Sequence, residues 1–172
     1  PWRTVDIGRI SISGHAGYDG RVFTLEGEGH DIGGRTDELH YLHARISGDG
    51  TITARIRRPM SSQWTKPGVM MRKSLDADSP HVSVLLQPHW SGVLVSRSQK
   101  GGDTSIGKPH PLGEAHVIKK NRLSTPYWVR LVRLHDIFTG YMSHDGLNWK
   151  DLGSVEIDLG EVVYAGLPAC SQ

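Results

Sequence analysis

Apolar and polar residues alternate along several short stretches of the chain. The alternation is clearest in ITARIRR (52–58), HVSVLLQ (81–87), GVLVSRS (92–98) and YWVRLVRL (127–134). Successive side chains of a β-strand point to opposite faces, so this pattern predicts strands with one buried face and one face that is exposed or lines a cleft. No stretch keeps apolar residues at the i, i+3, i+4, i+7 spacing of an amphipathic helix. The chain is therefore predicted to be all-β.

Turn signals rich in Gly, Pro, Asn and Asp separate the predicted strands. Strands that recur about every 8 to 12 residues are typical of a β-sandwich. In the clearest hairpin, Asp145-Gly146 connects FTGYMS to NWKDLGSV, because Gly146 supplies the positive φ of a tight turn. Residues 99–116 are rich in Gly and Pro and are predicted to form a long loop or an irregular edge.

Composition agrees with this pattern. The chain has 172 residues, with 21 Gly, 9 Pro and 37% hydrophobic residues, which suits a turn-rich β domain. No internal repeat or linker divides it, so we expect a single β-sandwich domain over residues 1–172 with two antiparallel sheets.

Charge and cysteine content narrow the choice of partners. A net charge of +2 is too small to indicate a nucleic-acid partner, and no apolar run reaches the roughly 18 residues needed to span a membrane. The single cysteine, Cys170, excludes an internal disulfide. The chain begins at Pro1-Trp2 without a signal peptide, as expected of a domain excised from a longer protein whose leader was removed.

Acidic residues are concentrated in EGEGHDIGGRTDELHYLH, residues 26–43. Glu26 and Glu28 are two apart, so on a strand they would share a face, and a retaining glycosidase needs two carboxyl groups about 5 Å apart. However, Gly27 and Gly29 interrupt the strand. The simpler interpretation of this stretch is a strand end followed by a Gly-rich turn.

A metal site is a second interpretation of the same stretch. Asp31 and Asp37, with Glu38, flank a Gly-rich loop that could surround a structural Ca²⁺. The alternative is an Asx-turn at Asp31 and a salt bridge between Asp37 and an arginine. His40 and His43 are three apart on a predicted strand, so they point to opposite faces and do not share one zinc ion.

Five segments, in order, carry a family resemblance: GHDIGGRTDELHYLHARISGDGTITARI, KPGVMMRKSLDADSPHVSVLLQP, PYWVRLVR, YMSHDGLNW and VVYAGLPACS. Together they resemble the concanavalin A-like lectin/glucanase domains of the "regulation of enolase" type, a family of formerly unknown function. The resemblance covers roughly Trp2 to Ser171. It implies a two-sheet jelly roll with a concave face, carbohydrate binding, and a place beside secreted enzymes of polysaccharide breakdown.

Two arginines of the family pattern lie in predicted interior strands. Arg72 shares a strand face with Met70, and Arg97 shares one with Val93 and Val95. An unpaired buried arginine is costly, so each is expected either to meet a carboxylate in a buried salt bridge or to line the concave groove. In the groove their planar donors, together with Gln87, would bind sugar hydroxyls or a uronate.

Aromatic side chains supply the second part of a sugar site, because their rings stack on the C–H face of a pyranose. Trp64 and Trp90 lie on polar loops, where we expect them to stack on a ligand at the rim, with His89 assisting, or else to pack as loop plugs. Trp128 and Trp149 match structural positions of the family and are predicted to belong to the core.

These observations favour non-catalytic binding of a polysaccharide or oligosaccharide by an accessory module of a secreted enzyme, with no cofactor required. One rival is a glycoside hydrolase or polysaccharide lyase, which needs a carboxylate or Tyr/His pair inside the groove. The other rival is a structural or protein-interaction β-sandwich with a featureless concave face.

Overall fold

A computed structural model describes residues 1–57, 66–87, 91–108, 110–111, 117–118, 122–123 and 127–170. The predicted β class is confirmed, because the described residues form antiparallel strands and no helix. None of the described segments is therefore a helix that could cross a membrane.

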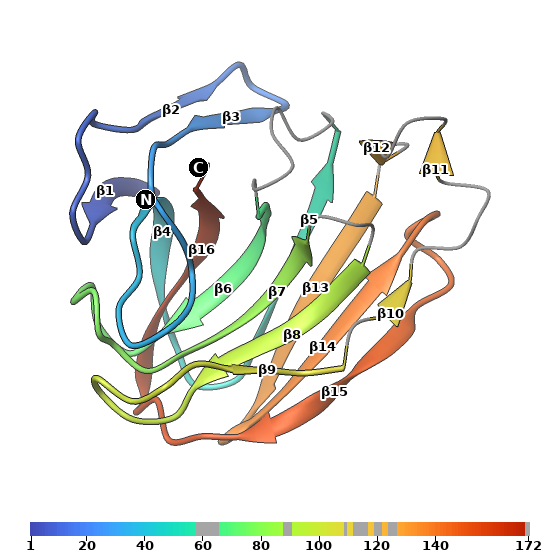
Figure 1. Cartoon of the computed structure of the whole chain (residues 1–172). Helices are drawn as coiled ribbons and strands as arrows, with labels where there is room; N and C mark the ends of the chain where they lie inside the picture. Colours follow the sequence, from blue (N-terminus) through green and yellow to red (C-terminus); the bar gives the residue numbers. More distant parts are fainter. Residues whose placement is uncertain are drawn as a thin grey trace.

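The larger of two stacked sheets has eight strands (Figure 1). Their order is β1 (Arg3–Ile7), β4 (Leu39–Ser47), β16 (Val162–Ala169), β6 (Gly68–Arg72), β7 (His81–Gln87), β8 (Ser91–Arg97) and β10 (His110–Pro111), with β9 (Ser105–Ile106) also paired to β8. The short strands β9 and β10 fall in the segment predicted to be an irregular edge.

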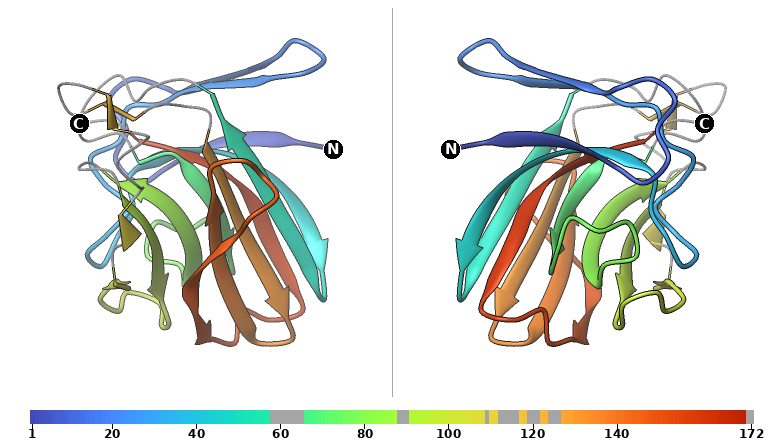
Figure 2. Two further views of the ribbon diagram at one scale, coloured as in Figure 1. Left: turned by 90° about the vertical axis from the view of Figure 1, so that its right-hand side faces the viewer. Right: turned by 90° about the vertical axis from the view of Figure 1, so that its left-hand side faces the viewer.

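The smaller sheet has four strands in the order β15 (Lys150–Glu156), β14 (Ile137–Ser143), β13 (Tyr127–Leu134) and β5 (Gly50–Ile56). Two further hairpins are β2 (His15–Tyr18) with β3 (Phe23–Glu26), and β11 (Val117–Ile118) with β12 (Arg122–Leu123). The β2–β3 hairpin lies across one end of the sandwich, at the top of Figures 1 and 2.

The main core lies between the two sheets. Apolar side chains at alternate positions of β6, β7, β13, β14 and β16 fill it, among them Val84, Leu131, Phe138 and Val163. Strands β5 and β13 alternate in burial as their sequences predict. The hairpin turn at Asp145-Gly146 is also confirmed, with Gly146 at φ +76°.

Strands β7 and β8 depart from the prediction of one buried and one exposed face. The described side chains of both strands are buried whichever face they occupy. The reason is a second core on the outer face of the large sheet, where Leu39, Tyr41, Met70, Leu85 and Val95 pack beneath Ile32 and Leu75 of the covering loops.

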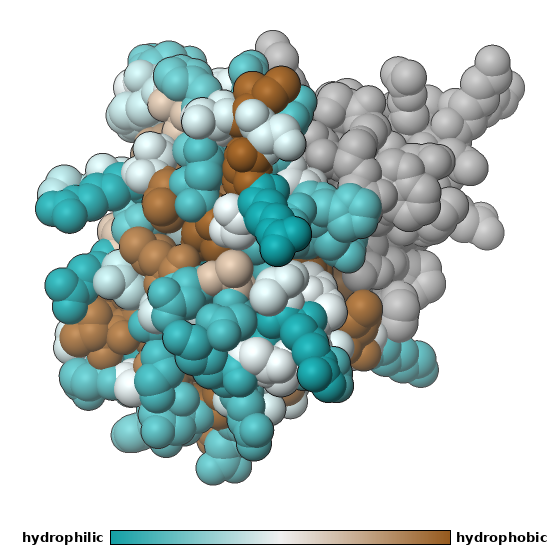
Figure 3. All heavy atoms as spheres, turned by 60° about the vertical axis from the view of Figure 1, so that its left-hand side comes forward, coloured by the Kyte–Doolittle hydropathy of each residue, from teal (hydrophilic) through white to brown (hydrophobic). Residues whose placement is uncertain are grey.

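Backbone hydrogen bonds tie these covering loops to one another. The Asp37 amide donates to the Ala77 carbonyl at 2.8 Å, and the Thr104 amide donates to the Gly34 carbonyl at 2.8 Å. The face that the family resemblance leaves open as a groove is thus covered. Figure 3 shows the surface on this side of the molecule, where hydrophilic side chains predominate and apolar residues occur in small groups.

The prediction that Trp128 and Trp149 belong to the core is wrong. Both are only partly buried. In β13 the odd-numbered positions from Tyr127 to Arg133 point into the sandwich, so Trp128 points outward, where Arg55 lies 5.6 Å from its ring centroid. Trp149 precedes β15 and lies against Arg130 on the same outer surface.

Candidate functional site

Arg72 and Arg97 meet in a buried charge cluster centred on Asp37. Arg97 binds the carboxylate in a bidentate manner, with Nη2 to Oδ1 at 2.7 Å and Nη1 to Oδ2 at 3.0 Å. Arg72 Nη1 donates to Oδ2 at 3.3 Å. All three side chains are fully buried, together with His81, whose Nε2 lies 3.8 Å from Oδ1.

Other donors of the two arginines bind the covering loops, while the buried Arg97 Nε has no hydrogen-bond partner among the described residues. Arg72 Nε donates to the Ser74 carbonyl at 2.7 Å, and Arg97 Nη1 donates to the Ser79 carbonyl at 3.1 Å. The structure therefore shows the buried salt bridge of the two alternatives, and neither guanidinium lines an open groove. The expectation that they bind sugar at the surface is corrected, because the carboxylate that neutralises them comes from the loop that covers them.

The side chains of the other predicted sugar-binding residues are not described by the structure. Gln87 ends β7, and only its backbone is described. Trp64, His89 and Trp90 lie outside the described residues. Their roles remain predictions from the sequence.

The two aspartates predicted to bind Ca²⁺ both pair with basic side chains. Asp31 accepts a hydrogen bond from Lys66, while Asp37 holds the two arginines. Within the part of the chain that the structure describes, no group of three or more His, Cys, Asp or Glu side chains is placed to hold a metal ion.

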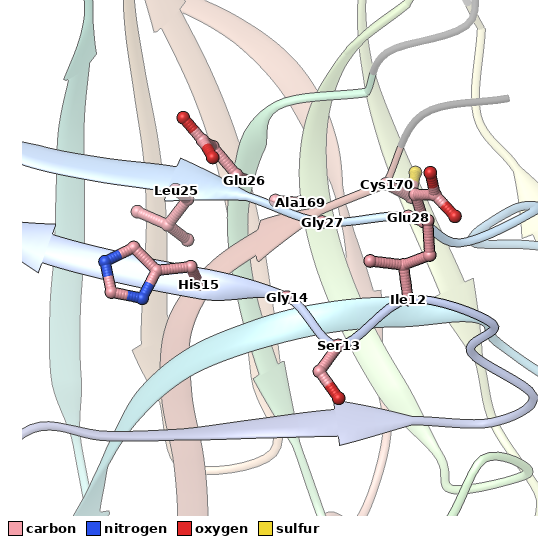
Figure 4. Close-up of a pocket in the computed structure, with 10 residues that line it drawn as sticks. All are labelled: Ile12, Ser13, Gly14, His15, Leu25, Glu26, Gly27, Glu28, Ala169 and Cys170. Carbon is pink, nitrogen blue, oxygen red and sulfur yellow. The ribbon is translucent and has the colours of Figure 1, made fainter.

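A pocket of about 360 Å³ lies beside the β2–β3 hairpin (Figure 4). Three chain segments meet there: the entry to β2, the end of β3 with the residues after it, and the end of β16. The lining residues are Ile12, Ser13, Gly14, His15, Leu25, Glu26, Gly27, Glu28, Ala169 and Cys170.

Two glycines let these segments approach closely over the ring of His40. A Cβ on Gly14 would lie 2.2 Å from His40 Cγ, and one on Gly27 would lie 2.6 Å from His40 Cβ. His40 Nδ1 is in turn 2.6 Å from Asp6 Oδ1, which also accepts the Gly14 amide at 3.1 Å. Partial burial acts to raise the pKa of Asp6, but these hydrogen bonds hold it below its usual value. His40 and Asp6 thus support the wall of the pocket.

The two glutamates occupy different parts of the pocket. Glu26 is the last residue of β3, whereas Glu28 lies beyond the strand, so they do not share a strand face as the sequence allowed. In Figure 4 the Glu26 carboxylate lies on the side of His15 and Leu25, and that of Glu28 lies beside Cys170. Both side chains are exposed. The arrangement offers separate hydrogen-bond acceptors and does not present two carboxylates facing each other.

Cys170 contributes an inert wall. Burial raises the pKa of its thiol to about 11, so the sulfur stays protonated and non-nucleophilic at neutral pH. The chemistry available in the pocket is therefore that of acceptors and donors: a hydroxyl, an imidazole and two carboxylates beside the apolar Ile12, Leu25 and Ala169.

Sequence reasoning singled out Glu26 and Glu28 but missed Ser13, His15 and Cys170. One local signal was present, since Asp19-Gly20 is a hairpin turn that brings His15 opposite Glu26 in the β2–β3 register. No local sequence signal indicates that the end of β16 lines the pocket, because Cys170 is distant in the sequence from β2 and β3.

Comparison with known proteins places the chain by its fold. No protein-family model matches it, and no curated protein matches it at a significant level. A functionally unknown protein from Saccharomyces cerevisiae superposes with a TM-score of 0.71 at 14% identity, covering 99% of this chain and 86% of that one. A carbohydrate-binding module, CBM66 from Bacillus subtilis, superposes with a TM-score of 0.60 at 15% identity, covering 97% and 86%.

These likenesses confirm the antiparallel β-sandwich that the alternation pattern predicted. At such low identity they establish the fold alone. The more specific resemblance to the "regulation of enolase" type of concanavalin A-like domain stays a prediction.

Proposed function

We propose that this protein binds carbohydrate without cleaving it, through the pocket beside the β2–β3 hairpin. The pocket's lining carries the proposal, because it includes two separate carboxylates, an imidazole and a hydroxyl together with apolar side chains. Its volume of about 360 Å³ is within the range of ligand sites, roughly 300 to 1,000 Å³. The fold likeness to CBM66 supports this function.

The polar lining suits a polyhydroxylated ligand. Each carboxylate has two acceptor oxygens, and hydrogen bonds to a charged acceptor contribute about 1.5–3 kcal/mol. Ile12 and Leu25 offer contact to the C–H groups of a sugar ring. Since no lysine or arginine of the described segments lines the pocket, we propose a neutral sugar as its ligand. On this account the domain is an accessory module of a secreted, polysaccharide-degrading enzyme.

Affinity electrophoresis against a panel of soluble neutral polysaccharides, run beside a reducing-sugar assay, tests the proposal. We expect retardation by at least one polysaccharide and no release of reducing ends. Glu26→Gln and Glu28→Gln should each weaken binding by about tenfold or more, since each loses a charge-assisted acceptor. Absence of retardation across the panel, or sugar release, would contradict the proposal.

Glu161→Gln is a matched control. Glu161 is an exposed glutamate next to the start of β16, whereas the pocket lies at the other end of that strand. Its carboxylate accepts a hydrogen bond from the Ser47 hydroxyl at 2.8 Å, and a carboxamide oxygen can do the same. Its retardation should equal that of the unaltered protein.

A further inference from the structure

The outer face of the four-stranded sheet carries arginine and aromatic side chains at neighbouring positions. In β13 the outward residues include Trp128 and Arg130. In the strand register Trp128 lies opposite Arg55 of β5, while Arg130 lies between Thr53 of β5 and Tyr141 of β14. In the left view of Figure 2 this four-stranded sheet is the one nearer the viewer.

Each of the two arginines is positioned by an aromatic ring. The Arg130 guanidinium carbon lies 3.7 Å from the ring centroid of Trp149, and Arg130 Nε donates to Thr53 Oγ1 at 3.0 Å. The Arg55 guanidinium carbon lies 5.6 Å from the ring centroid of Trp128. These contacts orient planar cations at the surface of the sheet.

Neither Arg55 nor Arg130 forms an ion pair with a carboxylate among the described residues. Arg97 and Arg72, in contrast, share a buried carboxylate, and Arg133 donates to the Gly160 carbonyl at 2.6 Å. The surface therefore offers two oriented guanidinium groups whose charge no carboxylate of the described segments neutralises directly.

The end of this surface is held rigidly by the turn between β14 and β15. Asp145 Oδ1 accepts the amides of Leu147 and Asn148, both at 2.8 Å, and Ser143 Oγ accepts the amide of Gly146 at 2.9 Å. A Cβ on Gly146 would lie 2.8 Å from Trp128 Cε2, so the turn packs against the indole. The Trp128 ring is thereby fixed in place before a ligand arrives.

From this arrangement we infer a second binding surface, made by Arg55, Trp128, Arg130, Tyr141 and Trp149, for a polysaccharide chain that carries uronic acids. The planar guanidinium donors complement sugar carboxylates in a bidentate geometry. The rings and the hydroxyl groups of Thr53 and Thr139 complement the remainder of the sugar units.

Acidic residues on the same face favour a polyuronate over a nucleic acid as the anionic ligand. Asp151 of β15 pairs with Tyr141, in the same row of the sheet as Arg130, and Glu156 pairs with Ile137 at the other end of the sheet. Both are exposed on the outer face. A phosphodiester chain carries one negative charge per unit, like a polyuronate, but it has at most one free hydroxyl per unit and so offers these carboxylates few donors. Sugar hydroxyls can donate to these carboxylates, so a chain with one carboxylate and several hydroxyls per unit fits the surface better.

The test is affinity electrophoresis in polygalacturonate, with fully methyl-esterified polygalacturonate as the uncharged comparison and single-stranded poly(U) as the competing class. The unaltered protein should be retarded by polygalacturonate and at least tenfold less by its methyl ester. The double variant Arg55→Gln/Arg130→Gln should lose about tenfold or more of the affinity, since two charge-assisted contacts are removed. The single variant Arg55→Gln, at an exposed position, should lose part of the affinity for polygalacturonate.

Arg45→Gln is the matched control, since Arg45 is an exposed strand arginine 6.0 Å from the Tyr164 ring centroid, but on the large sheet. It should leave retardation unchanged. Equal loss in this control, equal retardation by the methyl ester, or tighter binding of poly(U) would overturn the inference. Glu26→Gln should leave binding of polygalacturonate unchanged, so the proposal for this surface and the proposal for the pocket are tested separately.

Discussion

Replacing Asp37 with asparagine is expected to lower the free energy of unfolding by about 3–5 kcal/mol, the usual cost of removing one partner from a buried ion pair. The neutral carboxamide would leave Arg72 and Arg97 fully buried without a countercharge. The substitution would also release the loop that covers the outer core, because the Asp37 side chain joins that loop to β6 and β8. Urea denaturation followed by tryptophan fluorescence measures the change.

Asp103→Asn is the control for this prediction. Asp103 also pairs with an arginine, Arg35, at 3.0 Å, but both side chains are exposed. Exposed ion pairs contribute about 0–1 kcal/mol, so this variant should unfold close to the unaltered protein. If the two variants lose the same small amount, the Asp37 cluster does not hold the loop on the sheet.

Acidification is expected to destabilise the protein by roughly 3 kcal/mol between pH 6.5 and pH 4 through His81 alone. Burial, reinforced by Arg72 and Arg97 and opposed by Asp37, lowers the pKa of His81 from 6.5 to about 4. In this window the unfolded chain binds a proton that the folded chain excludes. Stability is therefore highest above pH 6.5 and falls as the pH approaches 4.

Urea midpoints measured at several pH values check this dependence. His81→Gln removes the titrating group, so its free energy of unfolding should fall less steeply between pH 6.5 and pH 4. The comparison uses slopes, because the variant also loses the contact of His81 Nδ1 with Ser83 Oγ at 3.0 Å. Burial also lowers the pKa of His43, which adds a smaller loss of the same sign to both proteins. Parallel slopes would show that His81 does not titrate as described.

The strands could be predicted from the sequence because their information is local. Alternation located β7 and β13, and a Gly after an Asp located the turn at Gly146. Which faces are buried could not be predicted in the same way. The outer face of β7 and β8 is covered by a loop around Ile32, far away in the sequence, and nothing in the alternation of those strands reports that contact.

The buried cluster of Asp37, Arg72 and Arg97 could be predicted in part from the chemistry of its residues, but the sequence does not tell which residues lie close together. The cost of burying an arginine indicates that Arg72 and Arg97 need a partner, and a salt bridge to an unspecified arginine is one of the two interpretations that the sequence allows for Asp37. Joining them required the fold, which brings three distant segments to one point. The pocket has the same origin, since Glu28 and Cys170 become neighbours only when β16 ends beside the β2–β3 hairpin.

Carbohydrate binding in this pocket is the central claim, and chemical-shift mapping tests it most directly. The ¹⁵N-labelled protein would be titrated with an oligosaccharide of the neutral polysaccharide that retards it most. We expect the shift changes to concentrate at the amides of the pocket residues Ser13, His15, Glu26, Gly27, Glu28 and Cys170. Saturating changes confined to other parts of the chain, or no changes at any of these amides, would contradict the claim.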